Sequence, residues 1–346
     1  MTTKDHPLVA RAHRLAREVL APSAERVDQE GVPAAHIDAI RRSGLLGVSA
    51  PEAYGGWEAP TAVARRTAEI LAGACCSTWF VQTQHHTPVA TLTGSEGAVR
   101  ERLLGPLARG ELLSGVAYAH LRSYPRTPVR AVREEGGWRF DGTVPWYTGW
   151  GLNDVMLLAG VTEGGEVVFA FTEARERPGL RASEPMRLAA LTASRTVSLE
   201  LAGLWLPDDA VALRKPYEEW AVTDRAKTVE ASPAVFGVTE AALGLLDEET
   251  AGPLRTRLEH LRGSAYALAD RSGAGEHLAE RLTLRIEAAE LMRTATTAAV
   301  VAGGGRSLSL AGTAQRLARE ALFLLVQGQT AQSRAAHLEA LRALAP

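Results

Sequence analysis

The chain has 346 residues, 46% of them hydrophobic and 23% charged, so it can bury a large core and is long enough for two or three domains. Its 38 basic and 40 acidic residues nearly cancel, which argues against nucleic acid or an acidic membrane surface as the main partner. The adjacent Cys75 and Cys76 do not have the spacing of metal ligands. The N-terminus lacks an apolar signal segment, and no run approaches about 18 apolar residues. We therefore expect a cytoplasmic protein that does not cross a membrane.

Residues 1–112 are predicted to form an N-terminal helical domain. A first helix is indicated by apolar residues at helical spacing, namely Leu8, Ala12, Leu15 and Val19. Pro33 begins a second helix and Gly44 ends it, because proline favours the first helical turn and glycine favours the left-handed residue after the last one. Two more helices are predicted over 61–76 and 95–111.

Residues 113–215 change to the pattern of strands, starting with the segment 112–119. The dipeptide Asp141-Gly142 favours a tight hairpin turn between two short strands. A second hairpin is predicted over 154–171, and the segment 195–203 alternates apolar and polar residues as a half-buried strand does. Short strands without intervening helices predict a β-sandwich or barrel.

Residues 216–346 return to helices and are predicted to form a C-terminal bundle. One apolar stripe consists of Leu278, Leu282, Ile286, Ala289 and Met292. Further helices are expected over 314–329 and 331–344. These helices are apolar on more than one side, which favours additional burial in an oligomer.

The stretch "FDGTVPWYTGWG" at 140–151 concentrates flat rings in a chain where aromatic residues make up only 5%. Trp146, Tyr147 and Trp150 fall within five positions, with Thr148 among them. Taken alone, such a cluster fits either the packed core of the β-domain or a surface for a flat ligand.

The order of helices, strands and helices, together with four motifs, resembles the acyl-CoA dehydrogenase family of flavoproteins. The motifs are "RRSGLLGVSAPEAYGG" at 41–56, "GGWRFDGTVPWYTG" at 136–149, "LAALTASRTVSLELAGLWLPDDAV" at 188–211 and "AQRLAREALFLLVQGQTAQ" at 314–332. The resemblance covers nearly the whole chain. It implies an α+β fold with an N-terminal helical domain, a middle β-domain and a C-terminal helical bundle.

The resemblance also implies a site for FAD. Trp146 would cover the flat ring and Thr148 would bond its N5 edge, while backbone groups of Tyr118 and Ala119 would meet the flavin edge. The family's "TEPxxGSD" stretch is replaced here by "GVAYAHLRSYP". His120 and Arg122 stand there instead and would face a substrate, a phosphate or water.

Two further motifs of the family are weak in this chain. The arginine of the "R…FG" motif, which reaches the pyrophosphate of FAD in a neighbouring subunit, has only Arg255 or Arg257 as a remnant. The "Q..GG.G" turn becomes "VVAGGGRS", whose three glycines at 303–305 need be no more than a turn between helices.

The catalytic carboxylate of the family is missing. Alignment on "REA" and "TAQ" puts Gly328 at the glutamate position, or Gln327 after a shift of one, and neither side chain can act as a base. Some family members carry the base on the first helix of the C-terminal domain, where Asp224 is the first candidate and Glu230 the second. Asp224 also fits the start of a helix, where aspartate is favoured by capping and the helix dipole.

The resemblance therefore implies an FAD-dependent, acyl-CoA dehydrogenase-like oxidoreductase that acts on an acyl thioester by α,β-dehydrogenation. Two alternatives stay open. One is a flavin-dependent monooxygenase on the same fold, which needs no carboxylate base, and the other is a catalytically degenerate subunit that needs a partner chain. A homodimer, homotetramer or hetero-oligomer is expected in each case.

Overall fold

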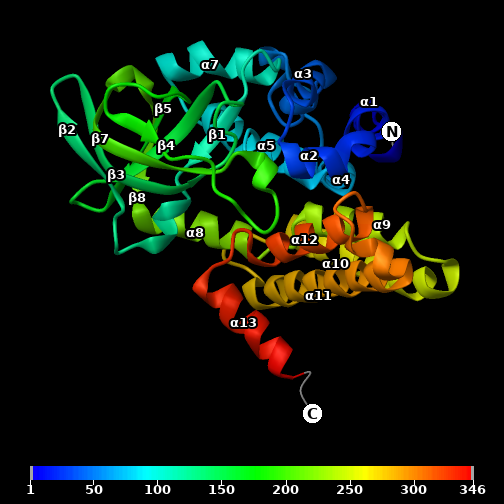
Figure 1. The fold of residues 1–346 in the computed structure, drawn as a ribbon. Helices are drawn as coiled ribbons and strands as arrows, with labels where there is room; N and C mark the ends of the chain where they lie inside the picture. The colour runs from blue at the N-terminus through cyan, green and yellow to red at the C-terminus, as the bar shows by residue number, and fades with distance from the viewer. Residues whose placement is uncertain (1–2, 344–346) are drawn as a thin grey trace.

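The computed structural model describes residues 3–343, and it has the α+β architecture that the sequence predicts (Figure 1). Helices of the N-terminal third lie beside a sheet, and the helices of the C-terminal third form a bundle along one side of both. Among residues 3–343, no helix combines the length and apolar character needed to cross a bilayer. Leu344, the last residue of the predicted final helix, lies outside the described residues.

The boundaries of α3 (Ala34–Ser43) in the N-terminal region lie at the proline and glycine that the sequence predicts as its ends. Pro33 precedes the third helix and Gly44 follows it with φ of 78°, the left-handed conformation that a glycine adopts without steric cost. The helices of this region are α1 (Pro7–Leu15), α2 (Ala24–Glu30), α3 (Ala34–Ser43), α4 (Thr61–Ala74), α5 (Cys76–Thr83), α6 (His86–Thr93) and α7 (Ala98–Ala108).

The middle region is one eight-stranded sheet with the order β6-β7-β3-β2-β4-β5-β8, and β1 pairs with β4 off this path. Alternate residues of β4 and β5 contribute to two separate hydrophobic cores, one enclosed by the curled sheet and one against α6 and α7. The strands are β1 (Ser114–Ala117), β2 (Val129–Glu134), β3 (Gly137–Tyr147), β4 (Val155–Val161), β5 (Glu166–Glu173), β6 (Leu180–Ala182), β7 (Val197–Pro207) and β8 (Val211–Pro216).

The prediction of a hairpin turn at Asp141-Gly142 is wrong. Strand β3 continues past this dipeptide without a turn, and the turn between β2 and β3 lies at Glu135-Gly136. Gly142 has φ of 130° at a register shift between β3 and β7, so the dipeptide makes a β-bulge. A β-carbon on Gly142 would collide with the carbonyl of Pro128, which explains why a glycine is needed there. The second predicted hairpin is present as β4 and β5.

The C-terminal bundle is joined to the N-terminal helices by a close crossing of α4 and α9. Gly73 and Gly237 let the two backbones approach until a β-carbon on Gly73 would lie 2.6 Å from the Gly237 carbonyl oxygen. The last helix turns away from the bundle (Figure 1), and Ser333 is its one buried residue. The helices of this region are α8 (Tyr217–Thr228), α9 (Pro233–Leu243), α10 (Glu248–Arg271), α11 (Leu278–Gly303), α12 (Thr313–Val326) and α13 (Ala331–Arg342).

A buried ionic network also ties α2 to α12. Arg316 donates to both carboxylate oxygens of Glu320, at 2.8 and 2.9 Å, and to Glu25 at 3.2 Å. Arg319 pairs with Asp28 beside it. The "REA" motif on α12 therefore has a structural role, because Arg319 pairs with Asp28 on α2 and Glu320 pairs with Arg316 inside the protein.

Cys75 and Cys76 lie in the same interior and are free thiols. Burial raises the pKa of Cys75 to about 11 and that of Cys76 further above its ordinary value. Within residues 3–343, no group of three or more histidine, cysteine or carboxylate side chains is arranged to hold a metal ion.

Candidate active site

The aromatic cluster at the end of β3 divides into core residues and one exposed ring. Tyr147 is fully buried, and Asn153 Nδ2 donates to its hydroxyl at 2.9 Å. Trp150 packs edge-on against Tyr147 at a centroid distance of 5.9 Å. Trp146 points the other way and is 53% exposed. Of the three rings, Trp146 is the one that can cover a flat ligand.

Thr148 is buried at the end of a chain of three hydroxyl groups. Thr148 Oγ1 lies 3.1 Å from Thr196 Oγ1, which lies 3.0 Å from Ser194 Oγ. Each hydroxyl has a single proton to donate. If the chain runs from Ser194 toward Thr148, the proton of Thr148 is left free for a ligand.

The segment after β1 forms the short 3-10 helix η6 (Ala119–Ser123), which contacts β3. Ala119 is exposed, so its backbone can be reached. Tyr118 packs edge-on against Phe169 at 5.5 Å, and burial raises the pKa of its hydroxyl to about 12. His120 points inward to the carbonyl of Ala159 at 3.0 Å, and burial lowers the pKa of this imidazole to about 4. His120 is therefore part of the core.

Arg122 and Asp224 bring η6 and α8 together. Nε and Nη2 of Arg122 each donate to one oxygen of the Asp224 carboxylate, both at 2.8 Å. The side chains are 31% and 12% exposed, so the pair is partly desolvated. A carboxylate in this arrangement must give up hydrogen bonds before it can accept a proton.

Glu230, the second candidate for a base, is also paired. Its Oε1 accepts from Arg281 Nη2 at 2.7 Å, and the same nitrogen donates to the carbonyl of Ala226 at 2.6 Å. Arg281 is 4% exposed, and it ties the end of α8 to α11.

Gln327 and Gly328 form the turn that follows α12. Gln327 is the C-cap of this helix, and Gly328 has φ of 64°. The carbonyl of Gln327 accepts from Nη2 of Arg285 at 2.9 Å, while Nη1 of Arg285 donates to the carbonyl of Thr228 at 2.8 Å. A guanidinium thus lies beside the position where the resemblance implied a carboxylate. Nothing in the sequence around Arg285 distinguishes it from other arginines on helices.

Two neighbouring histidines at the start of α6 are held neutral. His85 Nδ1 accepts from the backbone nitrogen of Ser114 at 3.1 Å, and His86 Nε2 lies 2.7 Å from Nε2 of Gln82. Burial lowers the pKa of His85 to about 3 and that of His86 to about 4.

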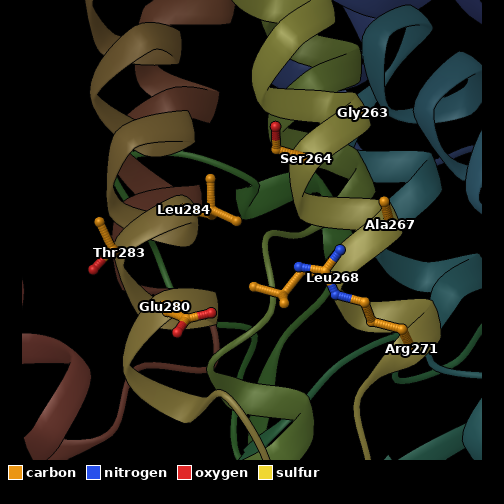
Figure 2. Close-up of a pocket in the computed structure, with 8 residues that line it drawn as sticks. All are labelled: Gly263, Ser264, Ala267, Leu268, Arg271, Glu280, Thr283 and Leu284. Atoms are coloured by element: carbon orange, nitrogen blue, oxygen red, sulfur yellow. The ribbon is translucent and has the colours of Figure 1, made fainter.

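The connection between α9 and α10 consists of residues 244–247 alone. Arg255, one of the two expected remnants of the pyrophosphate motif, lies inside α10 and pairs with Glu248 at 2.7 Å. A groove between α10 and α11 is lined by small side chains, polar side chains and two leucines of these two helices (Figure 2). Its two charged residues, Arg271 and Glu280, have opposite signs, and it contains none of the candidate site residues.

The N-terminal region and the fold each match known proteins. Residues 2–111 match the family described as acyl-CoA dehydrogenase, N-terminal domain. The structure of butyryl-CoA dehydrogenase from Megasphaera elsdenii is similar with a TM-score of 0.82 at 17% identity, covering 99% of this chain and 98% of that one. The chain therefore has an acyl-CoA dehydrogenase N-terminal domain and the acyl-CoA dehydrogenase fold, which confirms the expected family resemblance.

The same fold is shared by oxygenases. A dibenzothiophene monooxygenase from Paenibacillus sp. A11-2 is similar with a TM-score of 0.79 at 19% identity, over 97% of both chains. The likeness to these solved structures concerns the fold alone.

Curated relatives by sequence are named as monooxygenases. Dibenzothiophene monooxygenase of Rhodococcus erythropolis is 31% identical over 163 residues, which are 46% of this chain and 39% of the relative. A probable FMNH2-dependent monooxygenase of Pseudomonas putida is 34% identical over 96 residues, which are 27% of this chain and 23% of the relative. The chain thus matches less than half the length of these relatives.

Proposed function

We propose that the protein is a flavin-dependent monooxygenase on the acyl-CoA dehydrogenase fold. The observation that carries this proposal is the Gln327-Gly328 turn, which has a guanidinium beside it in place of a carboxylate. Dehydrogenation of a thioester needs a base for the α-proton, whereas oxygenation does not. The two candidate bases, Asp224 and Glu230, are each engaged by an arginine. The names of the sequence relatives support the same reading.

The residues at the end of β3 fit a flavin. The exposed indole of Trp146 offers a flat apolar surface, and Thr148 can direct a proton toward a ring edge. The backbone of Ala119 is accessible on η6, which lies against the same strand. A reduced flavin would supply the two electrons with which dioxygen gives one oxygen atom to the substrate and the other to water.

We infer that the flavin is FMN rather than the FAD that the resemblance implied. The four residues between α9 and α10 leave no segment equivalent to the "R…FG" motif, and Arg255 is paired with Glu248 on the outer side of a helix. A mononucleotide needs no contact to an adenosine half. Reduced FMN supplied by a separate reductase is therefore the form that we expect the protein to bind.

The ionisable side chains of His86 and Tyr118 are both uncharged at neutral pH. Burial lowers the pKa of His86 to about 4. Tyr118 keeps its proton at neutral pH because burial raises its pKa. The Arg122–Asp224 pair joins η6 to α8 through two hydrogen bonds.

The proposal is tested by flavin titration and by anaerobic spectroscopy. We expect reduced FMN to bind at least 10-fold more tightly than FAD. We also expect no bleaching of oxidised flavin on the protein by a panel of acyl-CoA thioesters without oxygen. Tightly bound FAD that such a thioester bleaches would make the protein a dehydrogenase. Binding of neither flavin would favour the degenerate subunit that needs a partner chain.

We also propose that the chain self-associates through its C-terminal helices. Leu322 and Val326 on α12 are each 57% exposed, and Leu338 on α13 is 47% exposed, so apolar side chains face outward on neighbouring elements. Light scattering on the wild type and on the variant Leu322→Glu/Val326→Glu tests this. A monomeric wild type would contradict it.

A further inference from the structure

Arg285 has an unusual set of partners for a partly buried guanidinium. Both of its hydrogen bonds go to backbone carbonyls, and no carboxylate among residues 3–343 forms an ion pair with it. Burial lowers its pKa, and the positive charge of Arg122 lowers it further. A cation in such a place needs compensation from something other than a counter-ion.

The compensation comes from two helix ends. Thr228 is the last residue of α8, and Gln327 is the C-cap of α12. The terminal carbonyls of a helix have no partner inside the helix, and together they carry roughly half a negative charge. One guanidinium therefore donates hydrogen bonds to otherwise unpaired carbonyls at the C-terminal ends of α8 and α12.

The candidate base Asp224 and the position of the family's glutamate lie at these two helix ends. Asp224 lies one turn before Thr228, and Gly328 directly follows Gln327. We propose that Arg285 is a positioning residue, which holds the end of α8 and the Gln327-Gly328 turn at a fixed separation and so sets the width of the flavin-dependent site. We call the two hydrogen bonds of Arg285 to Thr228 and Gln327 the clamp. The clamp does not depend on the proposed function, but its effect on flavin binding does.

Arg281 offers a matched control on the same helix. It lies one turn before Arg285 on α11, and it also binds a carbonyl near the end of α8, that of Ala226. Its other hydrogen-bond partners are Glu230, Gly273 and Glu276, so among the described residues it makes no hydrogen bond to α12. A change confined to Arg285 variants therefore reports the link to α12.

The experiment is amide hydrogen exchange on the purified full-length protein, with Arg285→Gln compared with Arg281→Gln. The amides to follow are those of Gln327 and Gln329, which donate to Phe323 and Val326 at 2.9 and 3.1 Å. We expect their exchange to be at least 10-fold faster in Arg285→Gln and unchanged in Arg281→Gln. Unchanged exchange in a folded Arg285→Gln protein would overturn the clamp.

A second readout separates positioning from mere stability. Arg285→Lys keeps the charge, but its single nitrogen cannot span the two carbonyls as the separate Nη1 and Nη2 of a planar guanidinium do. We expect it to bind reduced FMN at least 10-fold more weakly, with a melting temperature close to that of the wild type, and we expect methylguanidine to restore binding to Arg285→Ala. Faster exchange with unaltered FMN affinity would overturn the positioning role. If the wild type itself binds no FMN, the proposed function fails, whereas the exchange data still decide the clamp.

Discussion

Arg122 and Asp224 lie 102 positions apart in the chain and meet through two hydrogen bonds of 2.8 Å. This pair connects the segment after β1 to the first helix of the C-terminal bundle. It has a structural role that is independent of any catalytic one, and the two roles make different predictions.

Replacement of Asp224 by asparagine should lower stability, because Arg122 would keep its charge in a partly desolvated place without a counter-ion. We expect a loss of about 1–3 kcal/mol in the free energy of unfolding, measured by urea titration. The double variant Arg122→Met/Asp224→Leu should recover part of this loss. If Asp224→Asn is as stable as the wild type, the pair contributes nothing, and a catalytic role for Asp224 becomes the better explanation of its presence.

Replacement of Trp146 by alanine should weaken FMN binding with little effect on stability, because the ring is 53% exposed in the free protein. A lost aromatic stacking partner is worth about 0.5–1.5 kcal/mol, or a 2- to 12-fold weaker affinity by flavin fluorescence titration. The matched control is Trp205→Ala on β7, which removes a ring that is 44% exposed. Equal effects of the two variants would show that Trp146 is an ordinary surface residue.

Stability should fall as the pH is lowered below 6.5. His85, His86 and His120 have pKa values of about 3, 4 and 4 in the folded protein, all lowered by burial from an ordinary value of 6.5. Their contribution is complete above the unfolded pKa of 6.5 and is lost as the pH falls toward the folded values, because only the unfolded chain binds the protons. Each histidine should contribute a slope of about 1.4 kcal/mol per pH unit in this window.

Urea titrations between pH 7.5 and 5 measure this slope. The variant His120→Gln should have a shallower slope than the wild type, whereas His260→Gln, which changes an exposed histidine, should not. A slope that is the same in both variants would exclude His120 as a source of the pH dependence.

Replacement of Gly142 by alanine should be more damaging than the same change at Gly136. Both glycines have positive φ, of 130° and 69°, so both substitutions carry a backbone penalty of about 1–2 kcal/mol. A β-carbon at Gly136 meets nothing within 4 Å, whereas one at Gly142 meets the carbonyl of Pro128. We expect Gly142→Ala to cost about 1–3 kcal/mol more than Gly136→Ala in urea titrations. Equal costs would mean that the bulge relaxes freely.

The sequence predicted the fold well because the information is periodic and local. The helix that ends at Gly44 and the hairpin of β4 and β5 follow from side-chain spacing and from residues with special backbone preferences. The same local rule failed at Asp141-Gly142, because the preference for positive φ serves a bulge as well as a turn. Only the pairing with β7, which is distant in sequence, separates the two outcomes.

The candidate site was less accessible to sequence reasoning. The cluster at 146–150 has three rings, of which Trp146 and Tyr147 are adjacent and differ in direction, because successive residues of a strand face opposite sides of the sheet. Tyr147 went to the core and Trp146 to the surface. Arg285 gave no signal at all, because its role depends on where two other helices end. Asp224 was singled out as a carboxylate, but its partner Arg122 comes from a different domain.

The two adjacent thiols have a practical consequence for studies of this protein. Cys75 and Cys76 are buried, and the raised pKa of each keeps the thiolate, which is the reactive form, scarce at neutral pH. The native chain should thus give almost no background with maleimide reagents while it is folded. A single cysteine introduced at an exposed position of α13, such as Glu339, would then carry a fluorophore or spin label at one defined place without removal of the natural cysteines. Labelling of the native thiols would begin only on unfolding, so the rate of labelling would report the rate at which the protein unfolds.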